Sequence, residues 1–170
     1  QYLGEEAVAS LVRIVAESPA MSGAALAAEV STDETYVVEP LGDFEGKEPI
    51  ARVVAVDLGI KSRTPYHLAA RGVRVYVVPS TASFADIEAL KPDGVFFSNG
   101  PGDPEQVDAT QEAARGVLGK VPVFGICLGN QMVSIVAGAD IEKLKFGHHG
   151  GNEPVMNLLT GKVEITAQNP

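Results

Sequence analysis

The single cysteine of the chain, Cys127, lies in a setting that suits nucleophilic chemistry. It stands in the segment PVFGICLGNQ, Pro122–Gln131, with Gly125 and Gly129 two residues away on either side. This G-x-C-x-G pattern is the cysteine form of a nucleophile elbow, a sharp turn from a strand into a helix. Glycines permit such a turn without β-carbon clashes, so the side chain at its apex is expected to project into solvent.

A thiol at this apex would gain two chemical advantages. It would sit at a helix N-terminus, where the helix dipole and free backbone N–H groups favour the thiolate. The N–H of Leu128 would point to where an oxyanion forms on an attacked carbonyl, and such a donor is typically worth about 3 to 4 kcal/mol. The competing interpretation is a buried, inert cysteine. The paired glycines, and Gln131 one helical turn further on, favour the nucleophile.

A second segment of interest is FSNGPGDP, Phe97–Pro104. Gly100 and Gly102 belong to a rigid turn whose N–H groups can approach a ligand without an intervening side chain. Alone, this segment would be an ordinary Gly-Pro turn. In a parallel sheet, however, the loop lies beside the carboxyl end of the next strand, and therefore beside Cys127.

Regularly alternating elements are expected to position these loops. After residue 50, apolar and β-branched runs predict strands that alternate with helices. The expected strands cover residues 52–56, 73–78, 94–97 and 121–126, and the expected helices 66–71, 84–90, 104–118 and 128–137. Residues 145–154 are predicted to form a loop and residues 162–166 a final strand. This order predicts an α/β fold with a doubly wound, mainly parallel, flavodoxin-like sheet.

Residues 1–50 differ in charge from the rest of the chain. They hold two basic and ten acidic residues, whereas residues 51–170 hold 11 basic and 12 acidic residues. A helix over 5–16, a short helix over 23–29 and the extended stretch TYVVEP would bury little by themselves. The turn-rich stretch 41–49 then predicts a boundary. We expect an acidic, helical linker arm over 1–50 and one domain over 51–170.

The overall composition argues against several classes of partner. The 170 residues carry a net charge of −9 with scattered cations, which disfavours nucleic acid and anionic membrane surfaces. No apolar run approaches the roughly 20 residues of a membrane span, and no secretory signal is visible. A lone cysteine cannot form an internal disulfide, so the expected location is cytoplasmic.

The motifs FGICLGNQ and SNGPGDP, in this order and at this separation, resemble those of class I (triad) glutamine amidotransferases. Three further segments are similar to the small, glutamine-hydrolysing subunits of carbamoyl phosphate synthetase. They are VVAVDLGIKSRTP (Val53–Pro65), KLKFGHHGGNEPV (Lys143–Val155) and ITAQN (Ile165–Asn169). The resemblance covers about residues 20–169 and implies a glutamine amidotransferase domain over 51–170.

The resemblance implies specific roles for residues of this chain. Cys127 would attack the side-chain amide of L-glutamine, form a γ-glutamyl thioester and release ammonia. Gly102 and Leu128 would supply oxyanion-hole N–H groups. The positions that match glutamine-binding residues of the family are Gly100, Gly102, Leu128, Gln131 and Asn169.

The resemblance also implies a partner, a large synthetase subunit. That subunit would use the ammonia with ATP, Mg²⁺ and bicarbonate to make carbamoyl phosphate for arginine and pyrimidine biosynthesis. The chain shows no P-loop, so ATP chemistry is not expected on it, and we expect it to carry no cofactor and no metal.

A cysteine amidase also needs a general base, normally a histidine oriented by a carboxylate. The family has this pair in an H-P-E segment beyond the ITAQN motif, and no such segment follows in the 170 residues. His67 is predicted to be a surface or packing residue, and His148 and His149 to be structural or interface residues. We therefore expect a C-terminally incomplete fragment that hydrolyses glutamine poorly or not at all when alone.

Alternatives to this interpretation stay open at the sequence level. One is another class I amidotransferase, of the anthranilate or GMP synthase kind, or a γ-glutamyl hydrolase of similar fold. Another is a catalytically inactive binding or assembly module, in which the acidic arm docks the partner.

Overall fold

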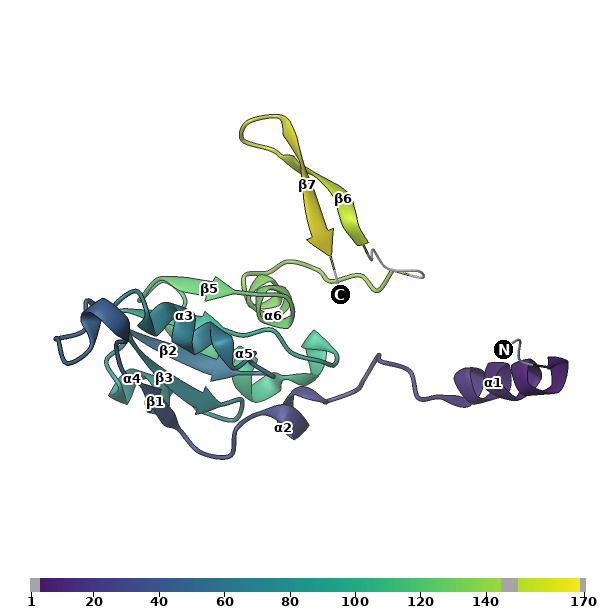
Figure 1. Ribbon diagram of the computed structural model, residues 1–170, viewed down its shortest axis with the longest axis horizontal. Helices are drawn as coiled ribbons and strands as arrows, with labels where there is room; N and C mark the ends of the chain where they lie inside the picture. The colour runs from purple at the N-terminus through teal and green to yellow at the C-terminus, as the bar shows by residue number, and fades with distance from the viewer. Residues whose placement is uncertain (1–3, 145–149, 169–170) are drawn as a thin grey trace.

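A five-stranded sheet forms the centre of the computed structural model, which describes residues 4–144 and 150–168 (Figure 1). The strands lie in the order β1-β3-β2-β4-β5, and every pair is parallel except β1 with β3. The predicted mainly parallel α/β fold is confirmed. The strand bounds are Tyr36–Val38 for β1, Ala51–Asp57 for β2, Val73–Pro79 for β3, Gly94–Phe97 for β4 and Val123–Gly125 for β5.

Strand β2 is at the middle of the sheet because its side chains are apolar on both faces. Val54, Ala55 and Val56 are all fully buried. Since successive side chains of a strand point to opposite faces, Val54 and Val56 pack in one cluster and Ala55 in the other. This β-branched run is therefore buried on both sides, as predicted from the sequence.

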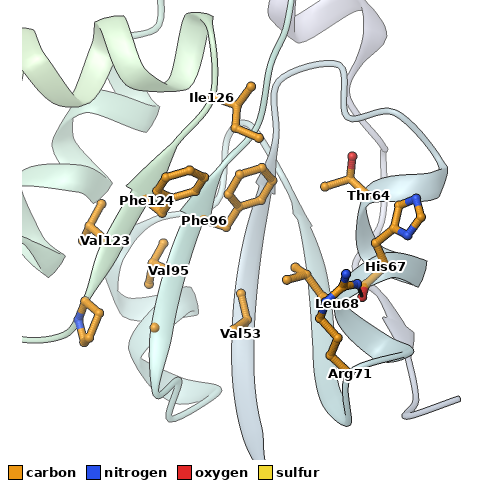
Figure 2. Close-up of a pocket in the computed structure, with 12 residues that line it drawn as sticks. Val53, Thr64, His67, Leu68, Arg71, Val95, Phe96, Val123, Phe124 and Ile126 are labelled. Carbon is orange, nitrogen blue, oxygen red and sulfur yellow. Dashed lines mark hydrogen bonds between the residues drawn. The ribbon is translucent and has the colours of Figure 1, made fainter. Parts of the chain in front are cut away.

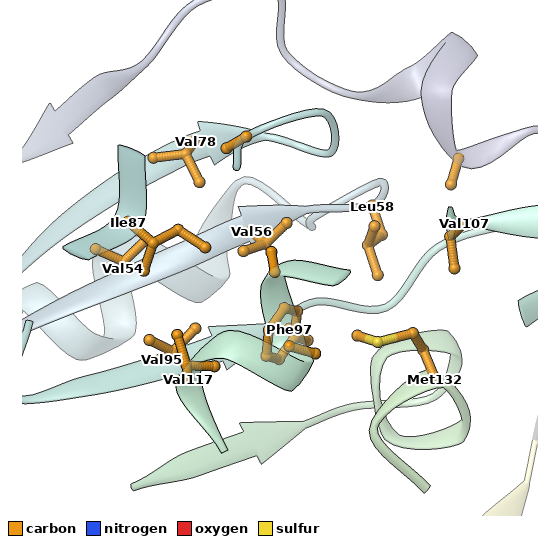
Figure 3. Packing of buried hydrophobic residues seen from close by; sticks show 14 of the residues in the cluster. Val54, Val56, Leu58, Val78, Ile87, Val95, Phe97, Val107, Val117 and Met132 are labelled. Carbon is orange, nitrogen blue, oxygen red and sulfur yellow. The ribbon is translucent and has the colours of Figure 1, made fainter. Parts of the chain in front are cut away.

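Helices pack against both faces of the sheet. On the first face, Ile87 and Met132 pack with Val54 and Val56 (Figure 3). The helices of this face are α4 (Phe84–Ala89), α5 (Asp108–Val117) and α6 (Leu128–Val136). On the opposite face, Ala69 of α3 (Arg63–Ala69) packs with the apolar side chains of β3.

Helix α4 begins with a reciprocal capping box. The backbone N–H of Asp86 donates to Ser83 Oγ at 3.2 Å, and the backbone N–H of Ser83 donates to Asp86 Oδ2 at 2.9 Å. The Ser83 hydroxyl also donates to Asp86 Oδ2, at 2.6 Å. The hydroxyl first, and then the backbone N–H of Ser83, holds the pKa of Asp86 below its ordinary value of 3.8.

The segment expected to be one helix over 104–118 consists of two elements. A 3₁₀ turn, η2 (Pro104–Gln106), is followed by α5 after a break at Val107. Val107 has φ −106° and ψ 50°, outside the helical region, and its side chain packs into the core. The prediction of an uninterrupted helix was therefore wrong at this residue.

The arm expected over 1–50 contributes to the sheet. Helix α1 (Glu5–Glu17) buries none of its side chains and lies apart from the sheet in Figure 1. Further along, α2 (Ala27–Val30) places Ala27 in the core, and β1 pairs with β3. The short 3₁₀ turn η1 (Gly42–Phe44) leads towards β2. Among the described helices, none combines the length and the apolar character that a bilayer crossing requires.

Strands β6 (Gly150–Asn157) and β7 (Lys162–Gln168) form a separate antiparallel hairpin. The final strand expected over 162–166 is confirmed. The expected loop over 145–154 is wrong for residues 150–154, which lie in β6, while residues 145–149 fall outside the described residues. The glycines and the proline of β6 disfavour a strand locally, and its pairing with β7 overrides this preference.

Candidate active site

Cys127 occupies the apex of a sharp bend between β5 and α6. Strand β5 ends at Gly125 and α6 begins at Leu128. Cys127 has φ 52° and ψ −116°, a conformation that residues other than glycine rarely adopt, and its side chain is exposed. The predicted presentation of an exposed thiol on a strained turn is confirmed.

The two glycines that flank Cys127 are required by close backbone contacts. A β-carbon on Gly125 would stand 2.6 Å from the backbone nitrogen of Asn130. A β-carbon on Gly129 would overlap the carbonyl oxygen of Phe97. Any larger residue at either position would therefore push the start of α6 away from the sheet.

The loop that follows β4 carries Gly100 and Gly102 and is held against the end of β2. Ser98 Oγ accepts a hydrogen bond from the backbone N–H of Leu58 at 2.9 Å, and Asn99 Nδ2 donates to the carbonyl oxygen of Gly59 at 3.0 Å. A β-carbon on Gly100 would overlap the carbonyl oxygen of Leu58. Gly102 has φ +100°, which glycine adopts without strain.

Direct hydrogen bonds join this loop to the elbow. The backbone N–H of Gly129 donates to the carbonyl oxygen of Ser98 at 3.1 Å, and that of Ile126 donates to Phe97 at 3.1 Å. Strands β4 and β5 are parallel neighbours, so that both loops leave the same edge of the sheet. Helix α6 also contacts η2, which follows the glycine loop. The structure thus brings together the two motifs that the sequence singled out.

Two further predicted site residues, Leu128 and Gln131, belong to α6. Leu128 is the first residue of the helix, and its side chain is buried in the core. Gln131 is half-buried one turn further on, and its backbone N–H donates to the carbonyl oxygen of Cys127 at 3.0 Å. Asn169 lies outside the described residues.

The sequence analysis missed two carboxylates at the carboxyl ends of the strands. Asp57, at the end of β2, accepts hydrogen bonds from the backbone N–H groups of Gly59 and Ile60 at 2.8 and 2.7 Å. Asp103 accepts from Gly23 at 2.8 Å and Glu105 at 2.9 Å.

The hydrogen bond from Gly23, and after it that from Glu105, holds the pKa of Asp103 below its ordinary value. The position of Asp103 before Pro104 and Glu105 is a local capping signal that could have revealed the bond within the loop. Nothing in the local pattern indicates the bond from Gly23, which is 80 positions away.

Residues 54–169 match the family described as glutamine amidotransferase class-I. The chain belongs to this family. Over 163 residues it is 57% identical to the carbamoyl phosphate synthase small chain of Bifidobacterium longum (strain NCC 2705). Over the same length it is 53% identical to the small chain of Corynebacterium glutamicum. Each alignment covers 95% of this chain and 40% of the relative, so the chain spans about 40% of the length of these curated relatives.

A solved structure supports the same amidotransferase fold. The structure is that of a Thermoplasma acidophilum protein described as a GMP synthase subunit. The match has a TM-score of 0.50 and 25% identity, and covers 63% of this chain and 55% of the other. The family match and this structural neighbour both agree with a class-I glutamine amidotransferase fold.

Of the three histidines of this amidotransferase chain, the structure describes His67. His67 is an exposed residue of α3, as expected for a surface residue, and its carbonyl oxygen accepts a hydrogen bond from Arg71 at 2.7 Å. His148 and His149 fall outside the described residues. Among the described residues, no group of three His, Cys, Asp or Glu side chains is arranged to hold a metal ion.

A large apolar groove lies on the face of the sheet beside α3, and Cys127 does not line it. The groove has a volume of about 870 Å³, and Figure 2 shows Phe96, Phe124 and Ile126 across from His67 of α3. Phe124 is 64% exposed and stacks on Phe96 with ring centroids 6.1 Å apart. The groove offers few polar groups that could bind a glutamine amide.

Proposed function

We propose that this chain is the glutamine-hydrolysing part of a carbamoyl phosphate synthase. Its family membership supports a glutamine amidotransferase, and its identity of 57% to a carbamoyl phosphate synthase small chain supports this type. The observation that carries the proposal is the exposed Cys127 at the apex of a strained elbow. An inert structural cysteine would have no need of this strained backbone.

In the proposed reaction, Cys127 acts as the nucleophile. Its Sγ attacks the side-chain carbonyl carbon of L-glutamine and forms a C–S bond, while the carbonyl electrons move onto oxygen. The backbone N–H groups of Leu128 and Gly102 stabilise this oxyanion. The C–N bond then breaks, the nitrogen takes up a proton and ammonia leaves. Water hydrolyses the resulting thioester, releases glutamate and restores the thiol.

Substrate binding is assigned to the two loops and the first turn of α6. Gly100 and Gly102 provide a backbone surface without side chains, and Gln131 provides an amide one helical turn from the nucleophile. Asn169 completes this set. A general base is also required, and in this proposal it comes from outside the described residues.

The ammonia is proposed to pass to a large synthetase subunit. That subunit uses ATP, Mg²⁺ and bicarbonate to form carbamoyl phosphate for arginine and pyrimidine biosynthesis. This chain needs no cofactor for its own step, because thioester chemistry uses only the thiol, a base and oxyanion donors.

The test compares two nitrogen sources in the whole protein assembled with a large synthetase subunit. We expect Cys127→Ala to abolish carbamoyl phosphate synthesis from glutamine and to leave synthesis from ammonium chloride unchanged. Ser134→Ala, at a half-buried residue of α6 whose hydroxyl donates to the carbonyl oxygen of Asn130, is the matched control and should preserve both activities. Equal loss of both activities in Cys127→Ala would contradict the proposal. Ammonia transfer to an anthranilate or GMP synthase partner instead would identify the alternative amidotransferase.

A further inference from the structure

The segment Gly23–Thr32, which we call the strap, crosses the carboxyl ends of neighbouring strands. At the end of β3, Ser31 Oγ accepts a hydrogen bond from the backbone N–H of Ser80 at 2.8 Å. At the end of β2, the backbone N–H of Thr32 donates to Asp57 Oδ2 at 3.0 Å. The strap is therefore anchored on two adjacent strands of the sheet.

A third anchor joins the strap to the loop after β4. The backbone N–H of Gly23 donates to Asp103 Oδ2 at 2.8 Å, and the N–H of Asp103 donates to the carbonyl oxygen of Ala24 at 2.9 Å. The other carboxylate oxygen of Asp103 accepts from Glu105 at 2.9 Å. Asp103 directly follows Gly102, so this reciprocal pair of bonds acts next to the glycine loop.

The strap also packs against the glycine loop. A β-carbon on Gly102 would stand 2.6 Å from the carbonyl oxygen of Ala24 and 3.0 Å from the nitrogen of Leu26. Val30 of the strap and Pro101 of the loop both pack on Gly59, which lies just after β2. A β-carbon on Gly59 would stand 3.1 Å from each of these two side chains. Loop and strap therefore cannot shift independently of one another.

We propose that the strap, acting through Asp103, holds the Gly100–Gly102 loop in the geometry that binds glutamine. Asp103 is a positioning residue in this inference, which rests on the proposed function. A glycine-rich loop has many accessible conformations, and fixing it costs conformational entropy. If the strap has already ordered the loop, the substrate does not bear this cost when it binds.

The experiment measures the labelling of Cys127 in the whole protein. One reagent is a glutamine-like chloroketone, which must occupy the glutamine site before it alkylates the thiol. The other is iodoacetamide, which needs only an accessible thiol. We expect Asp103→Asn to raise the saturation constant for the chloroketone by about tenfold, because asparagine replaces one acceptor oxygen with a donor. The iodoacetamide rate should stay within about twofold of wild type, because Cys127 remains at the apex.

Asp86→Asn is the matched control, because Asp86 is also a capping carboxylate but belongs to α4. It should leave both labelling rates unchanged. Ser31→Ala removes the anchor at the end of β3 and should raise the chloroketone constant by about threefold. This second variant keeps the test decisive if Asp103→Asn fails to fold.

The outcomes separate the two proposals. A wild-type protein that reacts no faster with the chloroketone than with iodoacetamide would overturn the proposed function and the role of the strap with it. If the wild type is selective but Asp103→Asn has an unchanged chloroketone constant, only the role of the strap is overturned. Ser31→Ala replaces Asp103→Asn in this comparison if Asp103→Asn does not fold. An equal loss in Asp86→Asn would likewise show that the effect is one of general stability.

Discussion

Gly129 lies so close to Phe97 that a β-carbon on Gly129 would overlap the carbonyl oxygen of Phe97. This contact sets the start of α6 directly against the end of β4, with the N–H of Gly129 donating to Ser98. The position of Cys127, two residues earlier, depends on the same contact.

Replacing Gly129 with alanine should therefore displace α6 and destabilise the protein. We expect Gly129→Ala to lower the free energy of unfolding by about 1–3 kcal/mol, as is usual for overpacking a core. Urea denaturation followed by circular dichroism measures this change. Gly151→Ala is the control, because a β-carbon at Gly151 meets nothing within 4 Å. Equal stabilities of the two variants would contradict the steric argument.

The backbone strain at Cys127 can be measured by comparing two substitutions of this residue. Glycine adopts a φ of 52° more easily than alanine does, so Cys127→Gly should be more stable than Cys127→Ala by about 1 kcal/mol. The measurement is again the free energy of unfolding in urea. Ala137→Gly, at an exposed residue with φ −76°, should instead destabilise the protein. A Cys127→Gly variant less stable than Cys127→Ala would show that the elbow is not strained.

The capping box of α4 predicts a pH-dependent contribution to stability. Because the pKa of Asp86 is lower in the folded state than its ordinary value of 3.8, folding favours the carboxylate. The contribution is therefore complete above about pH 4 and is lost as the pH falls through the folded-state pKa. We expect the difference in unfolding free energy between wild type and Asp86→Asn to shrink as the pH is lowered from 6 to 3. A difference that stays constant or grows would contradict this sign.

The isolated 170-residue chain should hydrolyse glutamine slowly or not at all. It contains three histidines, and the one that the structure describes, His67, is exposed on α3. Among the described residues, no side-chain hydrogen bond joins Cys127 to a base, and a missing general base typically costs about 10²- to 10⁴-fold in rate. Ammonia release by the purified chain, compared with Cys127→Ala, measures this. Rapid turnover that disappears in Cys127→Ala would instead assign the base to one of the three histidines.

The parts of the fold that the sequence predicted are those set by local patterns. The central strands follow from runs such as Val53–Val56, and the elbow follows from glycines placed two residues from Cys127. Helix bounds differ from expectation by only a few residues, except at Val107, where packing into the core breaks the helix.

The parts that the sequence analysis missed depend on partners far away in the chain. Strand β6 is stabilised by pairing with β7, and β1 joins the sheet through β3. The bond between Gly23 and Asp103 spans 80 positions, and neither residue has a neighbouring pattern that indicates the other. Long-range hydrogen bonds of this kind leave no periodic signal in a single sequence.

Strand β5 is the shortest parallel strand of the sheet and, among the described strands, pairs only with β4, whereas β2 is paired on both sides. We therefore expect the amide protons of β5 to be less protected from exchange with deuterium than those of β2. Local opening of the edge strand β5 would loosen the bend that carries Cys127 while the rest of the sheet stays intact. Mild urea should consequently abolish the selective reactivity of the thiol before it unfolds the chain.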